Sequence, residues 1–236
     1  LSPDGGLFMP EYISKLDNSF YNSISKYPIQ EIGFEVSKKF VDGEISENDL
    51  KNIIEDSINF DAPLVDLDDN ISILELFHGP TLAFKDFGAR FMARTMSHFL
   101  KDSDEEINIL VATSGDTGSA VASGFYGIEG INIYLLYPSG KVSDIQEKQL
   151  TTFDKNITTL EIDGTFDDCQ SLVKSAFVDE DINSKIILSS ANSINIARLI
   201  PQSFYYFNAY KQLQDKSKDV YISVPSGNLG NLTAGL

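Results

Sequence analysis

The sequence predicts an α/β protein with open, mostly parallel sheets covered by helices. From residue 71 onward, short apolar, β-rich runs alternate with helical patterns, which is typical of a parallel sheet covered on both faces. The chain of 236 residues exceeds the common single-domain size, and 42% hydrophobic residues suffice for a packed core. Three loops between predicted strands and helices also carry unusual residues, at the place where α/β sheets bind ligands.

The opening stretch predicts two helices. Ser46 and Asp49 have the spacing of a capping box, which would open the second helix. Apolar residues recur at near-helical spacing in the first helix, at Ile29, Ile32, Val36 and Phe40. The apolar face of the second helix consists of Leu50, Ile53, Ile54 and Ile58.

The rest of the chain predicts alternating strands and helices. The candidate strands are Ile71 to Leu76, Ile107 to Ala112, Ile131 to Tyr137, Ile157 to Ile162, Ile186 to Ser189 and Val220 to Val224. The candidate helices run from Lys85 through Leu100, from near Asp116, after the caps Ser143 with Gln146 and Thr165 with Asp168, and from about Ile194 to Leu213.

Composition excludes several classes of protein. Cys169 is the only cysteine, and the only histidines are His78 and His98, so neither an internal disulfide nor a metal site is expected. A net charge of -17 repels nucleic acid and anionic membranes. No apolar run approaches the roughly 20 residues of a membrane span, and the start lacks the pattern of a signal peptide, so a cytoplasmic protein is expected. The last residues resemble the first turns of a helix without a stop signal, so the chain is expected to be incomplete at its C-terminus.

The segment from His78 to Gly88 places Lys85 at the start of a predicted helix. A helix N-terminus disfavours a cation, and desolvation by Leu82, Phe84 and Phe87 would also disfavour the ammonium. Both effects predict a lowered pKa of the lysine, and hence a nucleophilic amine suited to a Schiff base. The alternative is a lysine whose stem lies along the surface while its head reaches water.

Two glycine-rich loops follow predicted strands and enter predicted helices. The loop from Ala112 to Ala120 offers hydroxyls and backbone N–H groups for a carboxylate or phosphate, although ordinary helix capping explains the same residues. The loop from Pro225 to Asn231 predicts an anion nest supported by the helix dipole. It lacks the features of a nucleotide P-loop or a dinucleotide fingerprint, so a phosphate monoester is the expected ligand.

A fourth segment, from Ser190 to Arg198, carries polar residues at helical spacing. Asn192, Asn195 and Arg198 are three residues apart, so in the first turn of a helix they would share one face and converge on a polar ligand. The alternative is an asparagine cap followed by an exposed arginine.

Together these segments resemble threonine synthases, members of the tryptophan-synthase-β-like group of pyridoxal-phosphate enzymes (fold type II). The similarity runs nearly end to end. The lysine segment and the Ser-Ala-Asn-Ser-Ile-Asn run are specific to threonine synthases within the group, whereas the glycine-rich loops are shared more widely. The segments that carry the resemblance are residues 3–10, 78–88, 113–118, 137–138 with 140–141, 190–198 and 224–236.

The resemblance implies two intertwined domains with the cofactor site between them. Residues 1–84 would form an N-terminal helical segment and the first part of a large cofactor domain. Residues 85–195 would form a small α/β domain, and residues 196–236 the start of the remainder of the large domain, truncated here. A later segment of the family supplies a hydroxyl side chain near the pyridine nitrogen, so activity is expected of the parent protein.

The implied activity is that of a lyase in threonine biosynthesis, which converts O-phospho-L-homoserine and water into L-threonine and phosphate. Lys85 would hold pyridoxal 5'-phosphate as a Schiff base and then shuttle protons. The other implied cofactor-binding residues are Asp116, Ser226, Gly227, Asn228, Leu229, Gly230 and Asn231. The implied substrate-binding residues include Ser114, Gly115 and Thr117, whose loop would bind the substrate carboxylate or the ring hydroxyl of the cofactor. The others are Lys141, Asn192, Asn195 and Arg198, which would face the substrate phosphate.

Two alternatives to a threonine synthase stay open. One is another lyase of the same cofactor group, such as a threonine/serine dehydratase. The other is a non-catalytic relative that binds a phosphate ligand. In each case the expected partner is a small molecule, without nucleic acid, membrane or metal ion, and the expected assembly is a monomer or homodimer.

Overall fold

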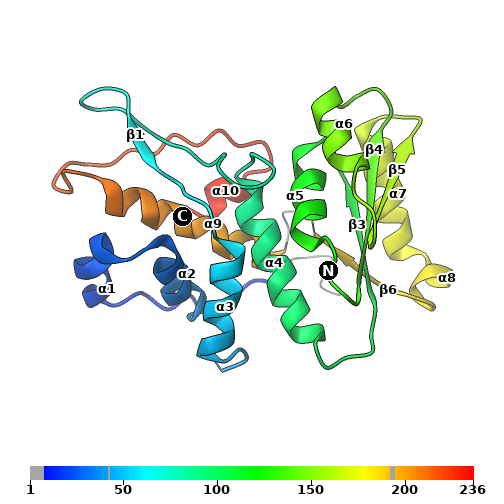
Figure 1. The fold of residues 1–236 in the computed structure, drawn as a ribbon, viewed down its shortest axis with the longest axis horizontal. Helices are drawn as coiled ribbons and strands as arrows, with labels where there is room; N and C mark the ends of the chain where they lie inside the picture. Colours follow the sequence, from blue (N-terminus) through cyan, green and yellow to red (C-terminus); the bar gives the residue numbers. More distant parts are fainter. Residues whose placement is uncertain (1–7, 42, 192–194) are drawn as a thin grey trace. The chain divides into compact units, whose positions relative to one another are not determined.

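The computed structural model describes residues 8–41, 43–191 and 195–236. The chain forms two compact units (Figure 1): unit 1 contains residues 1–91 and 193–236, and unit 2 contains residues 92–192. The boundary falls inside helix α4 (Lys85–Leu100), so the chain leaves unit 1 along this helix and later returns. The division into domains at residues 85 and 196 remains a prediction about the whole protein.

Unit 1 is built mainly of helices from both ends of the chain. Its first part contains α1 (Asn18–Ser23), the short 3-10 helix η1 (Ile24–Lys26), α2 (Ile29–Ser37) and α3 (Glu47–Ser57). Its later part contains α9 (Ile196–Gln212) and the single turn α10 (Gly230–Thr233). Helix α2 packs against both α3 and α9, so distant parts of the sequence share one layer.

One apolar core holds unit 1 together. The side chains that α2, α3, α4 and α9 bury there include Ile32, Leu50, Ile54, Phe87, Phe91 and Phe204. The apolar faces predicted for the two N-terminal helices are therefore confirmed, although α2 ends at Ser37, before Phe40. Gly33 permits the close approach of α2 and α9, because a β carbon there would lie 3.1 Å from the ring of Phe204.

Unit 2 contains a four-stranded parallel sheet with the strand order β5-β4-β3-β6. The strands are β3 (Ile107–Ala112), β4 (Ile131–Pro138), β5 (Ile157–Ile162) and β6 (Ile187–Ser190). The helices are α5 (Asp116–Phe125), α6 (Asp144–Thr151), α7 (Phe166–Val178) and α8 (Glu180–Asn183). All four strands were predicted to within one residue at each end, because buried parallel strands are continuous apolar runs.

Helices cover both faces of this sheet (Figure 1), with α5 on one side and α7 on the other. Alternate residues of each strand face opposite sides. Ala112 and Leu136 pack with Cys169 and Val173 of α7. The alternate strand residues that are fully buried are Ile109, Val111, Ile133 and Leu135. The sheet is therefore a central layer whose strand ends lead into helix starts.

The predicted helix starts are confirmed at three capping motifs. The Ser46 hydroxyl accepts a hydrogen bond from the Asp49 N–H and caps α3. Full capping boxes open α6 and α7, with Ser143 and Gln146 in the first and Thr165 and Asp168 in the second.

The strand predicted at Ile71 to Leu76 is shorter and lies outside the parallel sheet, and the strand predicted at Val220 to Val224 is wrong. The run from Ile71 to Leu76 forms only β2 (Ser72–Leu74), which pairs antiparallel with β1 (Leu64–Asp66) in a separate hairpin and not in the parallel sheet. The run from Val220 to Val224 forms no strand in the described part of the chain. Strand formation requires a hydrogen-bonded neighbour, and the side chain of Tyr221 is 91% exposed.

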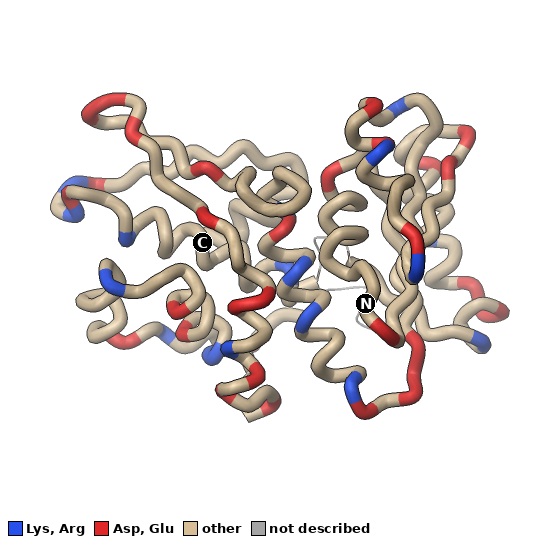
Figure 2. Tube along the Cα trace, viewed as in Figure 1, with Lys and Arg blue, Asp and Glu red and all other residues tan. Residues whose placement is uncertain are grey.

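Acidic residues outnumber basic ones by 35 to 18 and lie on elements of both units (Figure 2). Within residues 8–41, 43–191 and 195–236, no helix combines the length and the apolar character needed to cross a membrane. The same residues contain no cluster of His, Cys, Asp or Glu side chains that could hold a metal ion.

Candidate cofactor and substrate site

Lys85 is the first residue of α4, as predicted. Its Nζ lies 5.9 Å from the centroid of the Phe84 ring. The expected desolvation by Leu82 is wrong, since this side chain is 70% exposed. Leu82 lies in the loop before α4 with a left-handed φ of 59°, so it is not part of the buried helix face that holds Phe87. Phe87 is fully buried and packs against Phe60 at a ring centroid distance of 4.9 Å.

Asp86 closes the loop that precedes Lys85. Its carboxylate is fully buried and accepts hydrogen bonds from the Thr81 N–H (2.9 Å) and the Thr81 hydroxyl (2.6 Å). Burial raises the pKa of Asp86, and the bonds from Thr81 oppose that shift. A side chain at Gly79 would collide with this carboxylate. The backbone path into Lys85 is thus held by one buried acidic side chain.

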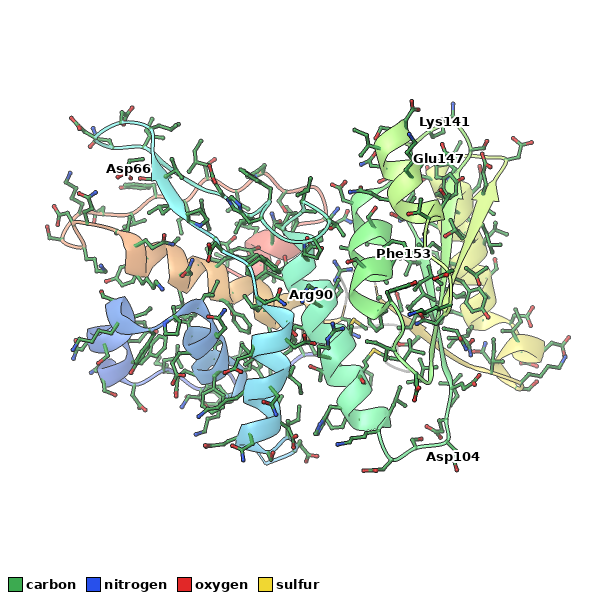
Figure 3. All side chains as sticks on the ribbon, in the orientation of Figure 1. Asp66, Arg90, Asp104, Lys141, Glu147 and Phe153 are labelled. Atoms are coloured by element: carbon green, nitrogen blue, oxygen red, sulfur yellow. The ribbon has the colours of Figure 1, made fainter. Side chains whose placement is uncertain are left out.

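Arg90 fixes the same part of α4 to the end of α3 (Figure 3). Its Nε donates to the carbonyl of Ser57 (2.8 Å), and one Nη donates to the carbonyl of Asp56 (2.5 Å). These carbonyls belong to the last turn of α3, where a cation is favourable. Lys85 therefore begins a helix that is anchored one turn later.

Arg198 lies in the first turn of α9 and is only 2% exposed. Burial lowers its pKa to about 10, which leaves the guanidinium charged at neutral pH. The alternative of an exposed arginine is therefore wrong. A β carbon at Gly88 would lie 2.9 Å from the carbonyl oxygen of Arg198. Because Gly88 follows Lys85 by three residues, the first turns of α4 and α9 lie against each other.

Asn195 is the N-cap of α9, where its side-chain oxygen accepts a hydrogen bond from the Ala197 N–H (3.0 Å). The alternative interpretation of Asn195 as a helix cap is thus confirmed. The cap uses the side-chain oxygen of Asn195, which was also predicted to face the substrate. Asn192, the third member of this set, lies outside the described residues.

The loop from Pro225 to Asn231 is closed by its own side chains. The Ser226 hydroxyl donates to the Asn231 side-chain oxygen, and the Asn231 amide donates to the Pro225 carbonyl (3.0 Å). Tyr206 of α9 donates its hydroxyl proton to the carbonyl of Asn231 (2.6 Å). Helix α9 is therefore hydrogen-bonded to this loop and packed against the start of α4.

The middle of this loop presents a run of backbone donors. Among the described residues, no hydrogen bond is made by the N–H groups of Gly227, Asn228, Leu229 and Gly230. A β carbon at Gly227 would find no atom within 4 Å, so that side of the loop is open. Helix α10 has only four residues, so its dipole adds little to the predicted anion nest. The nest therefore depends mainly on the backbone N–H donors.

In unit 2, the predicted turn between β3 and α5 is organised by Thr113. Its buried hydroxyl accepts hydrogen bonds from the N–H groups of Gly115 (3.0 Å) and Gly118 (2.8 Å). Among the described residues, the N–H groups of Ser114 and Thr117 make no hydrogen bond. Gly115 has a φ of 136°, a backbone conformation that residues with a side chain rarely adopt. Within the described residues, the turn therefore keeps two backbone donors available while Thr113 satisfies two others.

Lys141 lies in the turn between β4 and α6 (Figure 3). Its N–H donates to the carbonyl of Pro138 (3.2 Å), and Gly140 in the same turn has a φ of 61°.

The structure thus places the predicted site residues in two groups. Unit 1 holds Lys85, Asn195, Arg198 and the 226–231 loop, and unit 2 holds the 114–117 turn with Lys141.

Two protein families match the chain. The family "Threonine synthase N terminus" matches residues 1–58, and the family "Pyridoxal-phosphate dependent enzyme" matches residues 61–236. The chain belongs to the pyridoxal-phosphate-dependent enzymes. A threonine synthase of Haemophilus influenzae is 50% identical over 237 residues, which cover 100% of this chain and 55% of that protein. A threonine synthase of Escherichia coli K12 is 45% identical with the same coverage.

Solved structures of this family have the same fold. The crystal structure of threonine synthase from Escherichia coli matches with a TM-score of 0.91 and 44% identity, covering 100% of this chain and 55% of that one. A pyridoxal-phosphate-bound threonine synthase from Brucella melitensis matches with a TM-score of 0.91 and 39% identity, covering 99% and 52%. The chain spans about half the length of the curated relatives that it matches.

The residues of this pyridoxal-phosphate-dependent enzyme fit the two ends of such a cofactor within unit 1. An amine at the start of α4 suits the aldehyde of the cofactor, and the donors from Gly227 to Gly230 suit its phosphate.

Two residues that shape the loops around the predicted site, Asp86 and Thr113, were not predicted from the sequence. A threonine two residues before a glycine at a strand end is a signal for the second, since such hydroxyls often hold turns. No sequence signal marked the first.

Proposed function

We propose that the whole protein is a threonine synthase that converts O-phospho-L-homoserine and water into L-threonine and phosphate with pyridoxal 5'-phosphate. The membership of this chain in the cofactor family supports the cofactor, and relatives named threonine synthase support the reaction. The observation that carries the proposal is the setting of Lys85. It begins a helix whose first turn is held by the buried Asp86 and lies against the first turn of α9.

Lys85 holds the cofactor covalently through Nζ in this proposal. The bound cofactor supplies an electron sink for charge that develops on the substrate. Lys85 would also accept and return protons at the substrate carbons. The bonds of Asp86 to Thr81 and of Arg90 to α3 keep the helix start in place while Nζ moves.

The remaining residues bind and orient. Gly227 to Gly230 donate backbone hydrogen bonds to the cofactor phosphate, with Ser226 and Asn231 closing the loop. The turn from Ser114 to Thr117 binds the substrate carboxylate or the cofactor ring hydroxyl. Lys141, Asn192, Asn195 and Arg198 bind the substrate phosphate, which needs cations in a protein of net charge -17.

We also propose a cytoplasmic enzyme that is a monomer or homodimer. A chain with one cysteine suits a reducing compartment. The net negative charge disfavours nucleic acid and anionic membranes as partners.

Replacement of the lysine tests this proposal. In the full-length protein, Lys85→Ala should abolish formation of threonine and phosphate from O-phosphohomoserine, because no other group takes over the covalent and proton-transfer roles. Borohydride reduction of the wild type, followed by peptide mass spectrometry, should find the cofactor on the peptide that contains Lys85.

The matched control is Lys101→Ala, which removes a lysine just beyond the other end of α4 and should leave turnover unchanged. Circular dichroism should show that both variants fold. Near-normal turnover by Lys85→Ala would rule out the assignment, and release of ammonia without phosphate would favour a dehydratase.

A further inference from the structure

The side chain of Gln146 joins two helix starts in unit 2. Its Oε1 accepts hydrogen bonds from the N–H (3.3 Å) and hydroxyl (3.0 Å) of Ser143, which completes the capping box of α6. Its Nε2 donates to Oδ1 of Asp116 (2.9 Å), the first residue of α5. One amide thus uses its oxygen for its own helix and its nitrogen for the neighbouring helix.

The same amide also packs against the backbone of the turn before α5. A β carbon at Gly115 would collide with Cδ and Nε2 of Gln146, so the amide lies directly against this glycine. Helices α5 and α6 are in contact, and Thr113 supports the turn from the other side through Gly115 and Gly118. The turn is therefore held between a threonine hydroxyl and a glutamine amide.

We propose that Gln146 is a positioning residue for the turn from Ser114 to Thr117, and thereby for a carboxylate or ring hydroxyl bound there. This inference rests on the proposed function, which assigns that turn to the substrate or cofactor. Asp116 is exposed at the first position of a helix, where a carboxylate side chain has several accessible rotamers. Donation from Gln146 selects one of them, and contact with Gly115 restricts the adjacent backbone.

The two bonds of Gln146 can be separated by substitution. Gln146→Glu keeps an oxygen that accepts from Ser143, so the cap of α6 survives, but it places a second carboxylate opposite Asp116. Ser143→Ala does the reverse, since it removes the cap hydroxyl and leaves the bond to Asp116. Gln149→Glu is the matched charge control, because this side chain lies in the same helix and makes no hydrogen bond among the described residues.

The first measurement needs no cofactor. Backbone hydrogen exchange in the cofactor-free full-length protein should be at least about fivefold faster at residues 113–118 in Gln146→Glu, as expected for the loss of one hydrogen bond. Gln149→Glu and Ser143→Ala should leave these residues unchanged. The double variant Asp116→Asn with Gln146→Glu exchanges donor and acceptor and should restore slow exchange.

The second measurement links the turn to ligands. Titration with pyridoxal phosphate measures the cofactor Kd, and kinetics with O-phosphohomoserine measure KM and kcat. In Gln146→Glu, either the Kd or the KM should be at least about threefold higher than in the wild type, and kcat should change less. Exchange rates, Kd and KM equal to those of Gln149→Glu would overturn the inference. If the wild type itself does not bind pyridoxal phosphate, the proposed function fails, and the exchange data still decide whether Gln146 holds the turn.

Discussion

Arg198 shows how burial changes the role of a charged residue at a helix start. An arginine that is 2% exposed has lost most of its hydration, and its lowered pKa reflects that loss. Its backbone carbonyl accepts a hydrogen bond from Gln202 (2.5 Å) and lies close to Gly88. The residue therefore has a structural role in unit 1, to which the proposed function adds a role in binding phosphate.

We expect Arg198→Ala to lower kcat/KM for O-phosphohomoserine at least about tenfold in the full-length protein. A charge-assisted hydrogen bond to phosphate contributes about 1.5 to 3 kcal/mol, and the planar fork of arginine can donate two such bonds. Cofactor affinity should change little, because the proposed cofactor phosphate site is the 226–231 loop. Steady-state kinetics and a cofactor titration measure the two effects.

The control for this experiment is Arg198→Lys, which keeps the charge and most of the buried stem. It should retain more activity than the alanine variant. If both variants lose stability in urea while kcat/KM stays within about twofold of wild type, Arg198 is a structural cation only.

At the scale of elements, the contact between α4 and α9 sets the position of Lys85. Gly88 lies where the two helices approach, and the aromatic pairs Phe87–Tyr205 (5.3 Å) and Phe91–Phe204 (6.0 Å) continue the contact. Edge-on aromatic pairs of this kind stabilise beyond their buried area. The start of α4 thus depends on a helix that begins more than a hundred residues later.

Gly88→Ala should lower the stability of the full-length protein by about 1 to 2 kcal/mol. The added methyl group would lie 2.9 Å from the Arg198 carbonyl, so the helices must separate, which outweighs the gain of up to about 1 kcal/mol in helix propensity. Urea denaturation monitored by circular dichroism measures the change in midpoint.

Gly227→Ala is the matched control, because its added methyl group meets no atom within 4 Å. Its stability should stay within about 0.5 kcal/mol of wild type. Under the proposed function the same variant should weaken binding of pyridoxal phosphate, since the methyl group would stand where the backbone meets the phosphate. A Gly88→Ala protein as stable in urea as the wild type would contradict the close contact between α4 and α9.

Across the 236-residue chain as a whole, repulsion between like charges opposes association through exposed apolar surface. A net charge of -17 keeps copies of the chain apart by repulsion. The extended segment after α9 exposes Val220, Tyr221 and Ile222, by 49%, 91% and 60% respectively. An exposed apolar segment without a paired strand favours association once the repulsion is reduced.

The 236-residue chain should therefore associate more as salt increases. The Debye length falls from about 30 Å in 0.01 M salt to about 3 Å in 1 M salt, which screens the repulsion between copies. Sedimentation velocity should show a larger average mass at high salt for the wild type. The variant Tyr221→Asp with Ile222→Asp should show a much smaller increase, and an equal increase would assign the association to another surface.

Features that depend on neighbours a few residues away could be predicted from the amino-acid sequence. Capping pairs such as Ser143 with Gln146 and Thr165 with Asp168 predicted helix starts, because both partners lie within one turn. Buried runs such as Ile107–Ala112 predicted strands of the parallel sheet. The residue types around Lys85 and Gly227 predicted an amine and an anion nest at loops that enter helices, and the roles of both remain proposals.

Contacts between distant groups could not be predicted from the sequence and are seen only in the folded chain. The strand at Ile71 is antiparallel and the run at Val220 is unpaired, because strand identity depends on a partner that periodicity within one segment does not reveal. The burial of Arg198 against Gly88 and the bond from Gln146 to Asp116 likewise join residues 110 and 30 positions apart. Local hydrogen bonds form within one turn of chain, whereas these contacts form only when the folded chain brings separate elements together.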